Sequence, residues 1–276
     1  MPVEEAKVSV FDHGLLYGDG FFETLRSYGG IVFKADEHLK RFNRAVSLLS
    51  MNLSISTEEL EALIYKTIEL NALSDSTIRV TVTRGAGPPG LDPVVCPKPT
   101  IFIYAHTFKP YPDSYYRDGM EIVTASVRRS PIECPAWKTL TQIKSINFLP
   151  NILAKIESKQ SSAGEILLLN SSGHITECSV SNIFFVKGSA LYTPSLECGI
   201  LDGITRKVVT DIAQELSITV YEGEFFPATL YRADEVFLTN TIMEVMPVGK
   251  ADGRVFNKER LITNRLAAAY RKETER

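Results

Sequence analysis

Strand-like segments alternate with amphipathic helical patterns along the first half of the chain, and this alternation limits the folds open to it. Helices are predicted over residues 35–51 and 57–73, because apolar side chains recur there every three or four positions. Asp36 and Thr57 are their predicted N-caps. Strands are predicted in KVSVF, FFETLRSY, IVFKA, TIRVTVTRG and PTIFIYAHTF, with a hairpin turn at residues 28–30 (YGG) joining the second to the third. The combination predicts an α+β fold.

The second half continues this mixture. A helix is expected from Ser145 to about Ser161, and a last one from about Asn257. Between them, strands with turns are predicted in EILLLNSSGHITE, SNIFFVKGSALYTP and ADEVFLTNTIMEVMPV, and a loop leading into a helix in GILDGITRKVVTDIAQEL. The polar segment KPYPDSYYRDG, broken by two prolines, is the best domain connector. We therefore expect a smaller N-terminal domain over residues 1–112 and a larger C-terminal domain over residues 113–276.

The composition narrows the range of partners. Of 276 residues, 44% are apolar and 23% are charged, and the net charge of −3 comes without long runs of one sign. Neither a nucleic-acid surface nor a membrane anchor is therefore predicted, and we expect small-molecule partners in the cytoplasm. The cysteines are too scattered for a C-x-x-C pair or a zinc site, which predicts reduced thiols and no metal: Cys96, Cys134, Cys178 and Cys198.

Lys144 stands in TQIKSINFLP, where a helix is predicted to begin, with apolar residues on both sides. Desolvation favours the neutral amine of a lysine in such a place, and a neutral amine can attack a carbonyl to form a Schiff base. A surface lysine that extends its charge into solvent would give the same pattern. The other polar residues must decide between these interpretations.

Glu177 lies near the end of a predicted strand in GHITECSVSNIFF. A carboxylate there is usually solvated. One that faces a heterocyclic nitrogen would instead hold that nitrogen protonated and make the ring an electron sink.

Several groups suited to phosphate accompany these two residues. The loop GILDGITR carries Gly199 and Gly203 and leads into a helix whose first turn contains Thr205, so backbone N–H groups and a hydroxyl can bind an anion. An ordinary N-cap would explain the same residues. The turn TNT at residues 239–241 and the helix residue Arg41 offer further phosphate ligands. A lysine, a carboxylate and phosphate ligands together are what pyridoxal 5′-phosphate requires.

In these motifs and their order, nearly the whole chain resembles the fold-type IV pyridoxal-phosphate enzymes, the class IV aminotransferases. The segments that carry the resemblance are FDHGLLYGDGFFETLR, HLKR, IRVTVTRG, IKSINFLPNILAK, ITECSVSNIFF, LYTPSLECGILDGITR and ADEVFLTNTIMEVMPV. The resemblance implies a two-domain architecture like that of D-amino-acid aminotransferase, with the cofactor lysine, Lys144, in the C-terminal domain and the cofactor in the cleft between the domains. By the same resemblance, Glu177 partners the pyridine nitrogen, and the phosphate is bound by Arg41, Ile204, Thr205 and Thr241.

The chain could belong to any of three subgroups of this family. The neighbourhood of Lys144 and the position of Arg79 resemble branched-chain aminotransferases, although Thr77 and Phe148 stand where that subgroup typically has tyrosines. The segments TPSLECGILDGITR and TNTIMEVMPV resemble 4-amino-4-deoxychorismate lyases more closely. D-amino-acid aminotransferases are less favoured, because the loop after TRG reads AGPPGL and lacks their carboxylate-binding Arg and His.

A transaminase acting on amino acids and 2-oxo acids is therefore the leading hypothesis, with the lyase as the alternative. A binding protein that has lost the cofactor is a third interpretation, and it predicts a colourless protein. The resemblance also implies a homodimer. The substrate-side residues that we expect are Tyr17, Phe22, Arg26 and Arg79.

Overall fold

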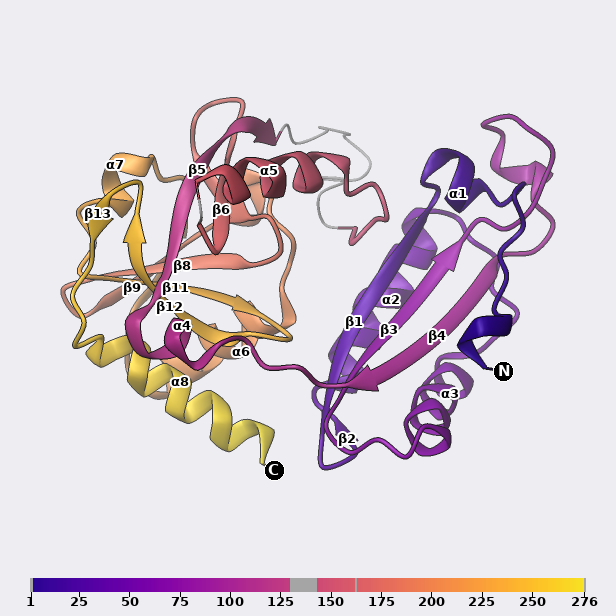
Figure 1. Ribbon diagram of the computed structural model, residues 1–276, viewed down its shortest axis with the longest axis horizontal. Helices are drawn as coiled ribbons and strands as arrows, with labels where there is room; N and C mark the ends of the chain where they lie inside the picture. The colour runs from indigo at the N-terminus through magenta and orange to yellow at the C-terminus, as the bar shows by residue number, and fades with distance from the viewer. Residues whose placement is uncertain (1, 130–142, 162, 276) are drawn as a thin grey trace. The chain divides into compact units, whose positions relative to one another are not determined.

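The computed structural model describes residues 2–129, 143–161 and 163–275. These residues form two units, drawn in Figure 1. The first unit contains residues 2–108 together with 143–147, and all other described residues belong to the second. A domain boundary after residue 112 stays a prediction, and we note that the segment around Lys144 packs with the first unit.

An antiparallel four-stranded sheet forms the centre of the first unit, in the order β2-β1-β3-β4. Its strands are β1 (Gly20–Tyr28), β2 (Ile31–Val32), β3 (Ser76–Thr83) and β4 (Thr100–Thr107). The predicted hairpin is confirmed, since Tyr28 pairs with Ile31 across Gly29 and Gly30. Both glycines have positive φ angles, 57° and 88°, which side chains rarely tolerate.

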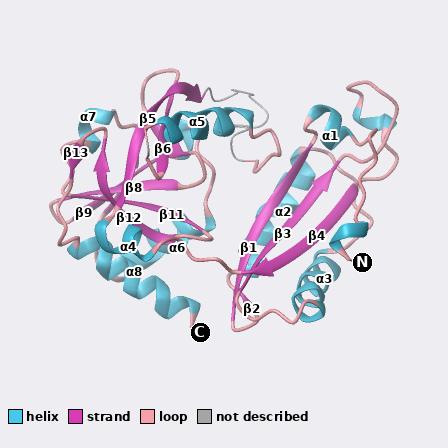
Figure 2. Ribbon diagram, viewed as in Figure 1, coloured by secondary structure: helices cyan, strands magenta, loops and turns pink. Residues whose placement is uncertain are grey.

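Two helices cover one face of this sheet, as Figure 2 shows. They are α2 (Ala35–Leu48) and α3 (Thr57–Leu70); the short elements η1 (Val3–Glu5), α1 (His13–Tyr17) and η2 (Pro93–Val95) complete the unit. The predicted caps are wrong by one or two residues. Lys34, in the left-handed conformation, precedes α2, and Ser56 caps α3 through a capping box with Glu59. Helical periodicity locates a helix but does not identify the residue whose side chain bonds its first N–H groups.

Alternation along β1 assigns its side chains to two different environments. Phe21, Glu23 and Leu25 point to the face that the helices cover, and all three are buried. Phe22 and its alternate neighbours along the strand point to the opposite face, with the corresponding residues of β3 and β4. The face of this sheet opposite α2 and α3 therefore carries the predicted substrate-side residues Phe22, Arg26 and Arg79, of which Phe22 is buried.

The second unit is built on a mixed sheet in the order β10-β9-β8-β11-β12-β5-β6-β7, with β13 added to β12. Its strands are β5 (Met120–Arg129), β6 (Glu165–Asn170), β7 (Ile175–Cys178), β8 (Asn182–Lys187), β9 (Ala190–Pro194), β10 (Val220–Gly223), β11 (Glu235–Asn240), β12 (Glu244–Ala251) and β13 (Arg254–Val255). The pairs β9–β10, β5–β12 and β5–β6 are parallel. Buried apolar side chains from several of these strands pack into one core, which includes Ile122, Phe185 and Met246.

The helices of the second unit are α4 (Asp113–Asp118), α5 (Leu149–Gln160), η4 (Leu196–Cys198), α6 (Ile204–Glu215), α7 (Pro227–Leu230) and α8 (Leu261–Thr274). The loop-to-helix prediction at GILDGITR is confirmed by α6. The predicted connector, residues 109–119, contains α4. The last helix begins at Leu261 and not near Asn257.

The structure also bears on the strand predicted in KVSVF and on the state of the cysteines. KVSVF forms no strand, because it has no strand partner among the described residues and its side chains Val8, Val10 and Phe11 are 48%, 67% and 57% exposed. The buried cysteines Cys96, Cys178 and Cys198 are free thiols; Cys134 lies outside the described residues. Within residues 2–129, 143–161 and 163–275, no helix has the length and apolar character needed to cross a membrane.

Candidate active site

Lys144 lies on an extended segment and not at the start of a helix. Phe22 N donates to Lys144 O (2.9 Å), Ile146 N donates to Gly20 O (3.1 Å), and Phe21 bridges Ser145, so this segment pairs with β1 through one isolated bridge. Ser145 N also donates to Ile143 O (2.8 Å), which makes a tight turn around Lys144. The helix predicted from Ser145 begins only at Leu149, because these pairings hold the preceding residues extended and Pro150 favours the first helical turn.

The same register places Lys144 opposite Phe22, on the face of the sheet that α2 and α3 do not occupy. Lys144 Nζ is 4.9 Å from the centroid of the Phe22 ring, and the Arg79 guanidinium carbon is 3.5 Å from it. An amine and a guanidinium thus share one aromatic ring. Burial lowers the pKa of Arg79, and nearby Tyr104 acts against that shift. The arrangement is suited to a carboxylate ligand.

The other two predicted substrate-side residues lie apart from this group. Arg26 is four residues farther along β1, about 13 Å at the usual rise of a strand, and its guanidinium carbon lies 4.2 Å from the Tyr28 ring and 3.6 Å from the Phe108 ring. Tyr17 lies on α1, where its hydroxyl accepts a hydrogen bond from Gly90 N (3.0 Å). Lys144, Phe22 and Arg79 are therefore the residues that the structure brings together.

A buried cluster on the opposite face fixes Arg41. Its Nε and Nη2 donate to the two carboxylate oxygens of Glu23, both at 2.7 Å, and His38 Nδ1 lies 2.9 Å from Glu23 Oε2. Burial alone would raise the pKa of Glu23, but the charge and hydrogen bonds of Arg41, together with His38, lower it to about 2. Burial lowers the pKa of His38, against the effect of Glu23. Sequence reasoning missed this role of Glu23; its signal was a carboxylate at a buried position of a strand.

Glu177 occupies a well-defined position in the second unit. Its Oε2 accepts hydrogen bonds from Asn182 Nδ2 (3.0 Å) and Leu201 N (2.9 Å), and Arg129 Nη1 lies 2.5 Å from its Oε1. Asn182 Nδ2 also donates to Leu201 O (3.0 Å). Asn182 was not predicted, although it lies only five residues after Glu177 in the same motif. It connects the strand end at Glu177 with the loop that leads into α6.

The N-terminus of α6 is suited to an anion. Its N-cap, Gly203, has no side chain to bond the first N–H groups of the helix, and Ile204 and Thr205 are buried there. A Cβ at Gly203 would collide with Asn182 Oδ1. On β11, Thr239 pairs with Asn182, and its buried hydroxyl has no hydrogen-bond partner among the described residues. The Thr239 hydroxyl on β11 and the first N–H groups of α6 therefore lie on elements that contact each other.

Thr241 follows β11 in a turn that Asn240 stabilises. Asn240 Oδ1 accepts hydrogen bonds from Ile242 N (2.8 Å) and Met243 N (2.7 Å). The predicted cofactor-binding residues belong to both units. Lys144 and Arg41 lie in the first unit, and the others lie in the second: Glu177, Ile204, Thr205 and Thr241.

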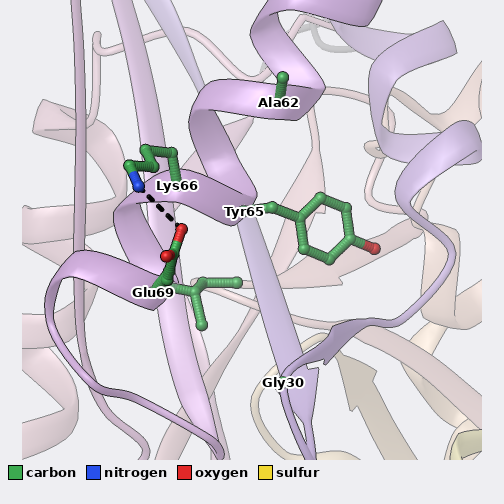
Figure 3. Close-up of a pocket in the computed structure, with 6 residues that line it drawn as sticks. Gly30, Ala62, Tyr65, Lys66 and Glu69 are labelled. Atoms are coloured by element: carbon green, nitrogen blue, oxygen red, sulfur yellow. Dashed lines mark hydrogen bonds and ion pairs between the residues drawn. The ribbon is translucent and has the colours of Figure 1, made fainter.

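A pocket of about 520 Å³ lies elsewhere on the first unit, beside the outer surface of α3 (Figure 3). Tyr65, Lys66 and Glu69 line it, and Lys66 Nζ pairs with Glu69 Oε2 at 2.9 Å. None of the predicted site residues is among the described residues that line this pocket, so the pocket is not the candidate active site.

The chain can be compared with known proteins on this basis. The sequence profile of the family "Amino-transferase class IV" matches residues 20–251. The chain belongs to this family. Its fold is that of the fold-type IV enzymes, as the resemblance predicted. It is therefore an enzyme of the class IV aminotransferase family.

Individual relatives represent two of the predicted subgroups. A protein of Methanocaldococcus jannaschii, provisionally named a branched-chain-amino-acid aminotransferase, is 42% identical over 97% of this chain and 91% of its own length. The aminodeoxychorismate lyase of Bacillus subtilis is 32% identical over 99% and 92%. The solved branched-chain amino acid aminotransferase of Escherichia coli superposes with a TM-score of 0.92 at 30% identity, over 98% of this chain and 90% of that chain. A further branched-chain aminotransferase, solved with N-(5′-phosphopyridoxyl)-L-glutamate, superposes with a TM-score of 0.91.

Proposed function

We propose that this class IV enzyme is a transaminase that moves the amino group of a branched-chain-like amino acid to a 2-oxo acid. The observation that carries the proposal is the group formed by Lys144, Phe22 and Arg79, in which an amine and a guanidinium share one aromatic ring. The carboxylate of a substrate would find an opposite charge in Arg79 there, beside an apolar ring and close to the amine of Lys144. Similarity to the M. jannaschii protein favours the branched-chain subgroup.

The cofactor of this enzyme family is pyridoxal 5′-phosphate, and the residues of this chain fit it. Its phosphate matches the uncapped first turn of α6 at Ile204 and Thr205, the buried hydroxyl of Thr239, and the neighbouring Thr241. Arg41 is the phosphate ligand that we predict in the first unit, where Glu23 binds its Nε and Nη2 on the helix-covered face of the sheet. When bound, the cofactor supplies an electron sink for charge that develops at the substrate Cα.

Each residue then has a defined task. Lys144 would hold the cofactor through its amine, and its Nζ would act as the base for the proton on the substrate Cα. Glu177 would keep a proton on the ring nitrogen of a bound cofactor, because a carboxylate next to such a nitrogen favours its charged form. Arg79 orients the substrate through its carboxylate, and Phe22 excludes water from one side of Lys144.

The alternative function, release of pyruvate and 4-aminobenzoate from 4-amino-4-deoxychorismate, would use the same lysine. It is supported by the similarity to the B. subtilis lyase. A D-amino-acid aminotransferase is a less favoured alternative, because the loop after Arg84 lacks the expected Arg and His. Transfer of ¹⁵N from a panel of L- and D-amino acids to 2-oxoglutarate or pyruvate separates these functions. Transfer from branched-chain L-amino acids supports the proposal; release of 4-aminobenzoate without any transfer would replace it with the lyase.

We also propose a homodimer in the cytoplasm. Support for self-association comes from apolar side chains that the single chain leaves in solvent near α1 and the loop after β3. Val10, Phe11, Leu15 and Leu91 are 67%, 57%, 65% and 82% exposed. Patches of this kind usually mark interaction surfaces. Analytical ultracentrifugation should give twice the mass of the chain, and a monomer at micromolar concentration would contradict the proposal.

A further inference from the structure

The turn formed by residues 178–181 joins the two residues that define the ring-nitrogen end of the proposed site. Glu177 lies directly before it on β7, and Asn182 begins β8 directly after it. Cys178 N donates to Ser181 O at 2.7 Å and closes the turn. The geometry of Glu177 relative to Asn182 therefore depends on this turn.

Glu165, at the start of β6, is 1% exposed and faces the turn with its carboxylate. Oε1 accepts hydrogen bonds from Ile166 N (3.0 Å) and from the Ser179 hydroxyl. Oε2 accepts them from Val180 N (3.3 Å) and the Ser181 hydroxyl (3.5 Å). All three residues at the tip of the turn thus donate to one buried carboxylate.

Two other elements hold the outer side of the same turn. Asn151 Nδ2, on α5, donates to Ser179 O at 2.6 Å. Asn240 Nδ2, at the end of β11, donates to Val180 O at 3.0 Å. Side-chain amides therefore bind the carbonyl groups of Ser179 and Val180. Glu165 binds the Val180 N–H and the two serine hydroxyls, and Ser179 N donates to Ile166 O at 3.1 Å. A shift of the turn would break bonds on both sides.

We propose that Glu165 is a positioning residue, which fixes the turn so that Glu177 and Asn182 keep the arrangement that holds a proton on the cofactor ring nitrogen. The proposal rests on the proposed function. It requires two acceptor oxygens at this position, because four donors converge on Glu165 and Lys155 Nζ lies 3.9 Å from its Oε1. A glutamine at this position would turn an amide N–H₂ toward donors on one side and leave them without an acceptor.

Glu235 provides a matched control in the same unit. It is 7% exposed, and its carboxylate accepts hydrogen bonds from Ile262 N (3.0 Å) and Thr263 N (2.7 Å) at the start of α8. It begins β11, at the opposite end of that strand from Thr239, the strand partner of Asn182. Both Glu165→Gln and Glu235→Gln remove a buried acceptor, but only the first touches the turn.

The experiment uses the enzyme reconstituted with pyridoxal 5′-phosphate labelled with ¹⁵N in the ring, and the ¹⁵N chemical shift reports protonation of that nitrogen. Glu165→Gln should move the shift toward the unprotonated value and weaken cofactor binding about tenfold, the usual size of an effect that passes through a hydrogen-bonded neighbour. Glu235→Gln should lower the unfolding temperature without changing either quantity. Hydrogen exchange at Val180 N in the apo protein should accelerate only in Glu165→Gln.

Unchanged ¹⁵N shift and cofactor affinity in a folded Glu165→Gln would overturn the inference, as would equal changes in Glu235→Gln. If Glu165→Gln does not fold, Ser179→Ala, which removes one donor and keeps the charge, should show a smaller shift in the same direction; no shift would again refute the role. A wild-type protein that binds no cofactor would instead refute the proposed function, so the two failures are distinguishable.

Discussion

Replacing Glu23 with glutamine removes the carboxylate shared by Arg41 and His38 and leaves a buried guanidinium without its bidentate partner. Arg41 and Glu23 side chains are 9% and 4% exposed, so solvent cannot replace the lost interaction. A fall in the pKa of Glu23 from 4.5 to about 2 corresponds to roughly 3 kcal/mol of stability. Breaking a buried ion pair by removing one partner costs a similar amount, about 3–5 kcal/mol. We therefore expect Glu23→Gln to lose about 3 kcal/mol at pH 7.

The pH dependence supplies a second test of the same argument. Because the folded-state pKa of Glu23 lies below its unfolded value, the stability it contributes is fully present above pH 4.5 and is lost as the pH falls toward about 2. Urea unfolding followed by circular dichroism should thus show a difference between wild type and Glu23→Gln that shrinks over this range. Glu69→Gln, which removes an exposed partner of Lys66, should have no measurable effect. Equal stability of wild type and Glu23→Gln at pH 7 would refute the reasoning.

Three other predictions follow from the site. Arg79→Ala should weaken carboxylate binding by about 1.5–3 kcal/mol, or roughly 10- to 150-fold in Kd; an unchanged Kd for 2-oxo acids in a spectral titration would remove Arg79 from the site. Gly203→Ala should raise the Kd for pyridoxal 5′-phosphate, because its Cβ meets Asn182 Oδ1, whereas Gly223→Ala, with its nearest neighbour at 3.4 Å, should not; similar values in a fluorescence titration would contradict this. Burial lowers the pKa of His38, so the free energy of unfolding should decrease as the pH falls below 6.5. His38→Gln should flatten this part of the plot of unfolding free energy against pH. An identical pH profile in the variant would argue against a buried neutral histidine.

The sequence predicts well those features that depend on local patterns. The hairpin at Gly29 and Gly30 and the helix after Gly203 were correctly predicted, because backbone conformation at glycine and helical periodicity are local properties. The helix predicted from about Ser145 to Ser161 is present as α5, but its predicted start was four residues too early, for the opposite reason. Residues 143–147 are apolar enough for a helix, but pairing with β1 holds them extended, and this partner lies more than 120 residues away in sequence.

Contacts between distant segments explain what was missed in the site. Lys144 and Glu177 are recognisable from their motifs, yet Glu23, Asn182 and Glu165 are not, because each becomes important only through partners that the fold brings close. Glu23 carried one usable signal, an acidic residue at an alternate, buried position of an apolar strand. Such a carboxylate requires a cation, and Arg41 supplies it from α2.

The near-ultraviolet and visible absorption spectrum of the purified protein, recorded with Lys144→Ala alongside, tests the central claim most directly. The account predicts a yellow wild-type protein whose absorption band shifts on addition of branched-chain L-amino acids, and a variant that shows no turnover. A wild-type protein that stays colourless with added pyridoxal 5′-phosphate, or a Lys144→Ala variant that transfers amino groups as fast as wild type, would contradict it.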